Sequence, residues 1–276
     1  MTGRYYAALN GDAVPMIGFG TSQLGDCAQI VAKALQIGYR HIDTAWKYGS
    51  EEGVGEGVKR SGIPRNRLFI TTKVSHEYLR AGDFARSLEQ SLSRLDTDYV
   101  DQLLVHWPST EGIPLAETMG ALAKAKREGK ARYIGVANFN IALTRDAMRL
   151  CPEPLTTLQA EYHPYLEQTK VLAFCREAGL IFMAYCPLGR GRLFEEPVLA
   201  DIARSRGKTI AQIALRWLVQ QGDIVPIPRS ANPAHMAESL QVFDFALSDE
   251  EMARIAALKR PDGRIADPIG RAPAWD

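Results

Sequence analysis

Four polar side chains within the first 110 residues could together transfer a proton. Asp43, Lys73 and His106 each end a short apolar run, and Tyr48 follows Asp43 by five residues. A tyrosine can protonate a carbonyl oxygen that gains negative charge, but its pKa of about 10 makes it a reluctant acid. A lysine at about 4 Å would favour the phenolate by up to ~4 kcal/mol, or about three pKa units. The residue types therefore predict acid catalysis by a tuned tyrosine.

The four residues would divide one proton transfer among them. Tyr48 is the expected donor, and Lys73 is the cation that tunes it. Asp43 would hold Lys73 charged and in place, and would offset part of its effect on Tyr48. His106, in its neutral form, would hydrogen-bond the carbonyl oxygen and orient it. Each residue alone has an ordinary structural explanation, such as a buried ion pair, so the prediction depends on all four together.

Strand-like and helix-like segments alternate along the chain in a way that could bring these residues together. The eight strand candidates cover 16–20, 39–43, 68–73, 99–106, 132–137, 156–161, 180–185 and 224–228. The helix candidates lie near 26–37, 50–60, 83–94, 115–128, 140–149, 167–178, 197–220 and 232–240. Several strands are continuous apolar runs, as expected for a parallel sheet covered by helices. The alternation predicts an α/β fold, a (β/α)8 TIM barrel, in which the carboxyl ends of the strands share one pocket.

Length and composition fit this fold and exclude several functions. The 276 residues show no linker or composition shift, which predicts one domain over 1–276. A net charge of +1 favours neither nucleic acid nor an anionic membrane as a partner. Because the start lacks a signal-peptide stretch and no run approaches 18 apolar residues, we expect a cytoplasmic protein. The four cysteines have no metal-ligand spacing, so we expect no metal site.

Segments at both ends lie outside the eight strand–helix units. Leu9-Asn10-Gly11-Asp12 is an Asn-Gly turn between short apolar segments, which predicts an N-terminal hairpin. A further helix candidate covers 250–257, and the segment from Pro261 to Asp276 follows it. Because barrel sites are built from loops, we expect this last segment to lie near the pocket.

A series of short motifs resembles the aldo-keto reductases and follows the order of that family from about residue 9 to about residue 258. The motifs are Gly-Tyr-Arg-His-Ile-Asp-Thr-Ala at 38–45, Tyr48-Gly49, Val54-Gly55, Ile70-Thr71-Thr72-Lys73, Asp98-Tyr99-Val100-Asp101, His106-Trp107-Pro108, Gly-Val-Ala-Asn-Phe at 135–139, Gln-Ala-Glu-Tyr-His-Pro at 159–164, Tyr-Cys-Pro-Leu-Gly at 185–189 and Ile227-Pro228-Arg229-Ser230. The chain is most similar to the short bacterial members, which include the 2,5-diketogluconate reductases. The resemblance implies a single barrel with the N-terminal hairpin closing its bottom. It also implies reduction of an aldehyde or ketone by a nicotinamide cofactor, here with Asp43, Tyr48, Lys73 and His106 as the catalytic set.

The resemblance also implies which residues contact the cofactor. Asn138 and Gln159 would hydrogen-bond the nicotinamide carboxamide, and Tyr185 would stack on the nicotinamide ring. Arg190 and Arg192 could add charge near the pyrophosphate, although solvated surface arginines explain them equally well. The full set of expected cofactor residues is Thr21, Asp43, Asn138, Gln159, Tyr185, Cys186, Leu188, Gly189, Arg229, Ser230, Asn232, His235 and Glu238.

The region expected to bind the 2′-phosphate of NADPH departs from the family pattern. The family usually has lysine where Arg229 stands, arginine where His235 stands and asparagine where Ser239 stands. Arg229 can still bind phosphate with two hydrogen bonds, whereas His235 would be a weaker and pH-dependent partner. A serine usual in the family is also replaced by Ala137. We expect NADPH as the cofactor, and NADH remains possible.

The expected substrate pocket contains Ser22, Trp46, Lys47, Trp107 and Trp275. Ser22 stands where the family usually has tryptophan, so one wall is expected to be more open and more polar. Lys47 could attract an acidic substrate or could be merely solvated. The expected partner is a small carbonyl compound, and the expected state is a monomer. The alternative function is a non-catalytic nucleotide-binding or regulatory protein on the same barrel, because a fold does not decide a function.

Overall fold

The computed structural model describes residues 5–9 and 12–276, and within them eight parallel strands form one sheet. The strands follow the order of the chain around the sheet, and each pairs with the next. The strands are β3 (Gly18–Gly20), β4 (His41–Asp43), β5 (Phe69–Val74), β6 (Val100–Val105), β7 (Ala131–Ala137), β8 (Thr157–Glu161), β9 (Ile181–Tyr185) and β10 (Ile224–Ile227). The Gly20 amide donates to the Pro228 carbonyl at 2.9 Å and joins the last strand to the first. The predicted (β/α)8 barrel is confirmed.

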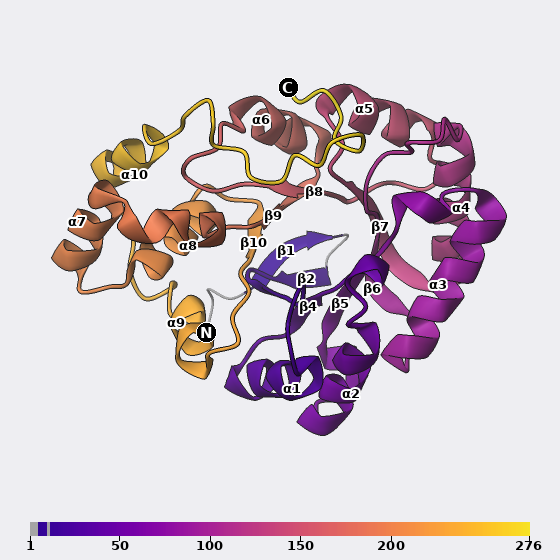
Figure 1. Ribbon diagram of the computed structural model, residues 1–276, viewed down its shortest axis with the longest axis horizontal. Coiled ribbons are helices and arrows are strands. Elements are labelled where there is room, and N and C mark those ends of the chain that lie inside the picture. The colour runs from indigo at the N-terminus through magenta and orange to yellow at the C-terminus, as the bar shows by residue number, and fades with distance from the viewer. Residues whose placement is uncertain (1–4, 10–11) are drawn as a thin grey trace.

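Helices surround the ring of strands on its outer side (Figure 1). They are α1 (Cys27–Ile37), α2 (Glu51–Ser61), α3 (Ala81–Leu95), α4 (Leu115–Arg127), α5 (Ile141–Leu150), α6 (Thr169–Ala178), α7 (Pro197–Arg206), α8 (Ile210–Gln220), α9 (Pro233–Leu240) and α10 (Asp249–Ala256). In the described part of the chain, four short 3-10 helices lie in the connections: η1 (Trp46–Tyr48), η2 (Arg65–Arg67), η3 (His76–Tyr78) and η4 (Gly189–Glu195).

The single helix predicted over 197–220 is wrong, because the chain forms two helices there. Gly207 ends α7 in the left-handed conformation at φ 61°, which a glycine adopts without strain. Thr209 then begins α8 with a capping box, in which its side chain accepts from the Gln212 amide and the Gln212 side chain accepts from the Thr209 amide. The continuous apolar periodicity hid both local signals.

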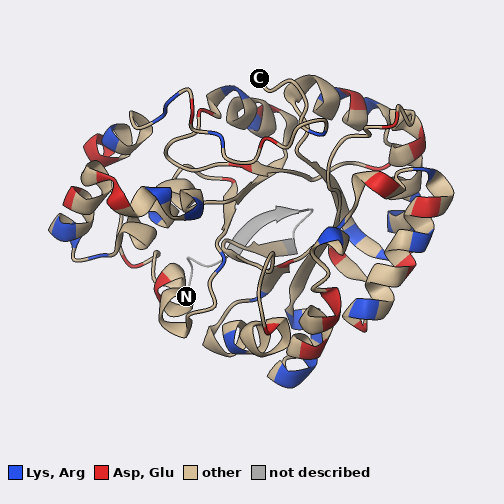
Figure 2. Cartoon of the chain, in the orientation of Figure 1, with Lys and Arg blue, Asp and Glu red and all other residues tan. Residues whose placement is uncertain are grey.

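Burial on both faces explains the apolar strands. Every residue of β6 is buried, because its outward side chains meet helices and its inward ones fill the barrel. Figure 2 shows the acidic and basic residues spread over the outer helices. Within the described ranges, no helix combines the length and apolar character needed to cross a membrane.

The N-terminal hairpin lies across one end of the barrel. Strands β1 (Tyr5–Leu9) and β2 (Asp12–Pro15) pair antiparallel, and Figure 1 shows them inside the ring of strands. Val14 is fully buried in a cluster with Phe69 and Ile181, which begin β5 and β9. The hairpin therefore covers the end of the barrel where the strands start. The predicted turn at Asn10-Gly11 lies outside the described residues.

Candidate active site

Asp43 and Lys73 form a buried ion pair at the ends of neighbouring strands. The Lys73 Nζ donates to Asp43 Oδ1 at 2.5 Å and to the Thr44 carbonyl at 2.8 Å. Lys73 is 1% exposed and Asp43 is 4% exposed, so both charges are shielded from water. Burial lowers the pKa of Lys73, but the neighbouring Asp43 and Tyr48 raise it by more. The net pKa lies above its usual value, so Lys73 keeps its charge, as the sequence predicted.

Tyr48 lies next to this pair on η1. Its ring centroid is 5.2 Å from the Lys73 Nζ and 5.6 Å from the centroid of the His106 ring. Burial raises the pKa of Tyr48, and Lys73 offsets only part of that rise, so the net shift is upward. The lysine acts in the predicted direction, but the sequence could not show how strongly burial opposes it. Tyr48 therefore holds its proton at neutral pH.

His106 follows β6 and is neutral at physiological pH. Its burial and the nearby positive charges of Lys73 and Arg271 place the pKa of His106 well below its usual value. The neutral form is the one that the sequence analysis required for orienting a carbonyl oxygen. A neutral imidazole can donate one hydrogen bond without adding charge beside Tyr48.

Three side chains from the second half of the barrel complete this end of the site. The Asn138 side chain donates to the His106 carbonyl at 2.9 Å and accepts from the Tyr185 hydroxyl at 2.7 Å. Gln159 donates from Nε2 to Asp43 Oδ2 at 2.8 Å. Asn138 holds a left-handed backbone at φ 62°, a conformation that asparagine adopts more readily than most residues. These bonds join residues at the ends of β7 to β9 to Asp43 on β4 and to the His106 carbonyl after β6.

A cavity of about 840 Å³ opens at this end of the barrel and collects most of the predicted site. The predicted residues that line it are Thr21, Ser22, Asp43, Lys47, Tyr48, His106, Trp107, Asn138, Gln159, Tyr185, Cys186, Leu188, Arg229, Ser230, His235 and Glu238. They come from the carboxyl ends of strands and from the connections that follow these strands, as expected for a barrel site.

Five predicted residues lie outside the lining of the cavity: Lys73, Gly189, Asn232, Trp46 and Trp275. Lys73 is buried beneath the lining, and Asn232 caps α9 by accepting from the Ala234 amide. Trp46 lies against Tyr78 and donates to Gln90. Trp275 packs edge-on against Trp107 with 6.3 Å between ring centroids, so it supports the Trp107 side of the cavity without lining it.

The comparisons with known proteins agree with this geometry. The profile of the Aldo/keto reductase family matches residues 16–260. The chain belongs to the aldo/keto reductase family. It is 40% identical to methylglyoxal reductase DkgB of Salmonella typhimurium over 267 residues, which cover 95% of this chain and 99% of the relative. The reductase is therefore an oxidoreductase, and its relatives give no support to the non-catalytic alternative.

Solved structures of relatives have the same architecture as this reductase. One is a protein assigned as a 2,5-diketo-D-gluconic acid reductase B, with 44% identity, a TM-score of 0.96 and coverage of 100% of this chain and 98% of that chain. Another is an aldo-keto reductase of Bombyx mori solved in complex with NADP, with 30% identity, a TM-score of 0.90 and coverage of 98% and 96%. Aldo/keto reductases use NADP(H), which agrees with the predicted cofactor.

The far end of the cavity has the donor set that a phosphorylated dinucleotide requires. Arg229, Ser230 and His235 line it at the start of α9, and Arg190 lines it from η4. The Arg229 guanidinium donates to the carbonyl oxygens of the first loop, at 3.0 Å for Gln23, which holds it beside the cavity. The cationic and hydroxyl groups suit phosphate oxygens, so the residues present fit NADP(H).

Several lining residues of this reductase were missed by the sequence analysis. Phe194, Thr209, Ala266 and Arg271 line the cavity from the second half of the chain. They lie on connections and on the last segment, where neither strand periodicity nor a motif marks them. Arg190 was one of two candidates near the pyrophosphate, and it does line the cavity. For Ala266 and Arg271 the only available signal was the expectation that the last segment lies near the pocket, and Phe194 and Thr209 had no signal.

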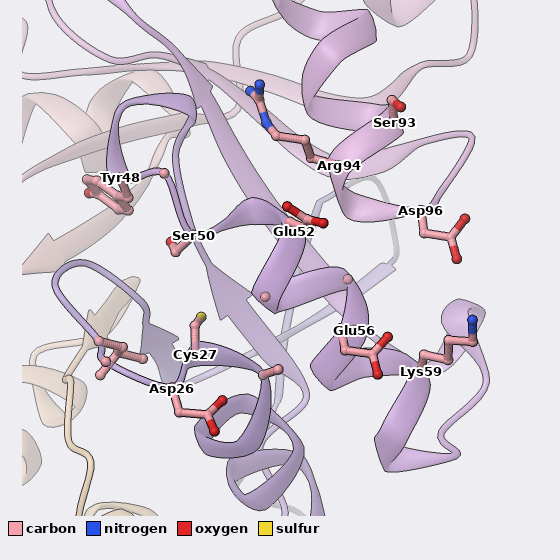
Figure 3. Close-up of a pocket in the computed structure, with 16 residues that line it drawn as sticks. Asp26, Cys27, Tyr48, Ser50, Glu52, Glu56, Lys59, Ser93, Arg94 and Asp96 are labelled. Carbon is pink, nitrogen blue, oxygen red and sulfur yellow. The ribbon is translucent and has the colours of Figure 1, made fainter.

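A second cavity, of about 730 Å³, lies between α1, α2 and the end of α3 (Figure 3). Asp26, Glu52, Glu56 and Asp96 line it, with Lys59 and Arg94 as its cations. This excess of carboxylates repels phosphate, so the cavity does not suit a dinucleotide. The Cys27 thiol also lines it, and burial raises the pKa of this thiol to about 11, which keeps it protonated. The chemistry of this reductase therefore belongs to the first cavity.

Proposed function

We propose that this reductase converts an aldehyde or ketone into an alcohol, with Tyr48 as the proton donor. The observation that carries the proposal is the buried Lys73–Asp43 pair beside Tyr48, with a neutral His106 at 5.6 Å between ring centroids. All three of Asp43, Tyr48 and His106 line the cavity that fits NADP(H). A carbonyl placed there would meet a proton donor and a second hydrogen-bond donor together.

The chain's own residues would prepare and protonate the carbonyl. When bound, NADPH supplies the hydride from C4 of its nicotinamide. His106 donates a hydrogen bond to the carbonyl oxygen and orients it, because its neutral ring adds no competing charge. Tyr48 gives its proton to the same oxygen as negative charge develops there. Lys73 stabilises the phenolate that remains, and Asp43 keeps Lys73 in position.

Second-half residues would hold the cofactor in the same cavity. Asn138 and Gln159 would bind the carboxamide, and Tyr185 would stack on the nicotinamide. Toward the other end, Leu188 would border the pyrophosphate, and Arg229 with Ser230 would bind the 2′-phosphate. Asn138 and Gln159 already bond Tyr185 and Asp43, so cofactor binding would exchange or share these hydrogen bonds.

The setting of the reaction can be proposed more broadly. The relatives named above point to small carbonyl compounds such as methylglyoxal and a diketogluconic acid as substrates for this chain. We also propose that the protein acts as a monomer. We further propose that residues 1–276 act as one domain and that the protein works in the cytoplasm.

Replacing Tyr48 with phenylalanine tests the proposal. The variant loses only the hydroxyl group, so kcat/KM should fall by roughly 100-fold or more, the usual contribution of a general acid. Cofactor binding, followed by NADPH fluorescence, should survive. Tyr99→Phe is the matched control, because Tyr99 stacks under Arg65 outside the cavity. Near-normal turnover of Tyr48→Phe would remove Tyr48 from the role of acid.

A further inference from the structure

Arg271 brings a positive charge to the reacting end of the cavity. It lies in the last segment of the chain and lines the cavity with His106 and Trp107. Its guanidinium carbon is 5.6 Å from the centroid of the Trp107 ring. Its charge is one of the causes that lower the pKa of the neighbouring His106. Arg271 is therefore close to the position that the substrate carbonyl would occupy.

The two cations at this end of the cavity differ in how they are paired. Lys47 also lines the cavity, but its Nζ bonds both carboxylate oxygens of Glu77, at 2.8 and 2.9 Å. Lys47 is thus neutralised by its own chain. Among the described residues, Arg271 has no acidic side chain within ion-pair distance. A half-buried guanidinium without an anion is a site that an anionic ligand can complete.

Backbone contacts on both sides hold the segment that carries Arg271. Before it, the Ile265 and Ala266 amides donate to the two carboxylate oxygens of the buried Glu161, at 2.8 and 2.7 Å. After it, the Asp276 side chain accepts from the Ile141 amide at the start of α5. Figure 1 shows this segment, in yellow, running from α10 past α6 to α5. Arg271 therefore lies on a span that is fixed at both ends.

We propose that Arg271 binds the carboxylate of the substrate, so that the preferred substrates are oxo acids, which carry both a carbonyl and a carboxylate group. The proposal rests on the proposed carbonyl reduction and deepens it. A planar guanidinium can hold a carboxylate with two parallel hydrogen bonds. A carboxylate carries one negative charge, which matches the one unpaired positive charge of Arg271. A phosphate carries a second negative charge, which would need Lys47, and Lys47 is already paired with Glu77.

A pair of nearly isosteric substrates tests this assignment. 4-Carboxybenzaldehyde carries a carboxylate, and 4-formylbenzamide carries a neutral amide of the same shape. The measured quantity is the ratio of their kcat/KM values with NADPH. Arg271→Gln should lower this ratio by roughly 10- to 100-fold, mainly through KM of the acid, because charge-assisted hydrogen bonds have this strength. Arg271→Lys should give a ratio between those of the wild type and Arg271→Gln, because lysine keeps the positive charge but lacks the planar guanidinium.

Control variants separate Arg271 from general electrostatics. Arg149→Gln removes an exposed arginine of α5 outside the cavity and should leave the ratio as in the wild type. An unchanged ratio in Arg271→Gln would overturn the proposal, as would a larger loss in Lys47→Gln. Far-UV circular dichroism and the thermal midpoint should confirm that each variant is folded.

A binding measurement keeps this proposal distinct from the proposed function. Calorimetry with NADPH present, which cannot oxidise an alcohol, would compare 4-(hydroxymethyl)benzoate with 4-(hydroxymethyl)benzamide. Tighter binding of the benzoate to the wild type, lost in Arg271→Gln, supports the carboxylate site without any turnover. If the wild type reduces neither aldehyde, carbonyl reduction of this kind fails, and the calorimetric comparison still decides the role of Arg271. Equal binding of acid and amide to the wild type overturns that role.

Discussion

Tyr48 experiences two opposing influences on its proton. Burial raises its pKa, and the charge of Lys73 lowers it by less. The protonated form, which a reduction consumes, is thus the resting form at neutral pH. The phenolate that remains after transfer lies beside Lys73, so the same cation that only partly offsets burial becomes most useful when the proton has left.

His235 is the residue whose replacement should change the choice of cofactor. It is exposed at the start of α9 and lines the cavity near Arg229 and Ser230. His235→Arg should raise the preference for NADPH over NADH, because a permanent planar cation pairs with the 2′-phosphate. The expected gain is about 1–2 kcal/mol, or about tenfold in the ratio of kcat/KM values for the two cofactors.

Gln241→Arg gives the matched control for that change. Gln241 follows α9, is exposed and lies outside the cavity lining. An arginine at this position therefore adds the same charge near the same helix without reaching the cofactor. If Gln241→Arg matched His235→Arg, the gain would be a general field effect. An unchanged cofactor ratio in His235→Arg would show that this residue does not face the 2′-phosphate.

Single residues were predictable where strands end and where motifs mark them. Asp43, Lys73 and His106 end apolar runs, which places them at one edge of the barrel. Arg271 gave no such signal, because it lies in a segment without periodicity, and the Ile265 and Ala266 amides of that segment donate to Glu161. The pairing of Lys47 with Glu77 was also hidden, since it joins η1 to η3 across 30 residues.

The last segment is held at its start by one buried side chain, Glu161. Glu161 is fully buried and accepts from His163 Nε2 as well as from the Ile265 and Ala266 amides. Burial raises the pKa of Glu161, but these donors lower it by more, so the carboxylate stays charged. An anion with two acceptor oxygens is therefore the group that fixes the segment over the cavity.

Glu161→Gln should release this segment. An amide offers one acceptor oxygen and places its own N–H groups against the backbone donors. Trypsin should then cleave after Arg264 and Arg271 at least several-fold faster than in the wild type, as measured by mass spectrometry of timed digests. Glu153→Gln, which alters a surface pair with Lys126, is the control. Equal cleavage rates in the wild type and in Glu161→Gln would show that other contacts hold the segment.

The boundaries of the helices were the part of the fold that the sequence predicted least well. Apolar periodicity ran through 197–220, so the break at Gly207 and Thr209 was not recognised. Periodicity reports which face of a helix is buried. Because α8 packs against β10 and α7 packs against α8, both helices bury a face and the apolar pattern continues across the break. The position of the break was marked by the capping residues rather than by the apolar pattern.

At the scale of the whole molecule, the eight strands and the barrel followed from the sequence, but the contacts that close the barrel did not. Closure depends on contacts such as that of Gly20 with Pro228, which join segments 208 residues apart. Gly18 has a related role, because a Cβ at that position would come within 3.0 Å of His41 Nδ1. The glycine leaves the space that the buried histidine ring fills.

That buried histidine should make the stability of the whole barrel depend on pH. Burial lowers the pKa of His41 to about 4, whereas an unfolded histidine has a pKa of about 6.5. Between these values the unfolded chain binds the extra proton, so stability is lost as pH falls from about 6.5 to about 4. The contribution is about 3 kcal/mol, present in full above pH 6.5.

Urea unfolding of the wild type and His41→Gln at several pH values between 7 and 4 measures this contribution. The free energy of unfolding should fall less steeply with acid in the variant, because its side chain does not titrate. The acidic residues are the same in both proteins, so the difference isolates His41. Parallel pH profiles would place the acid sensitivity of the barrel elsewhere.

The chain divides its chemistry between two halves. The residues proposed for proton transfer come from β4 to β6 and the connections after them, and the groups suited to the cofactor come mainly from β7 to β10 and the segments after them. Two hydrogen bonds, from Gln159 to Asp43 and from Asn138 to the His106 carbonyl, cross between them. Half-barrels exchanged between relatives could therefore recombine an acid with a new cofactor preference, provided that these two contacts are inherited together.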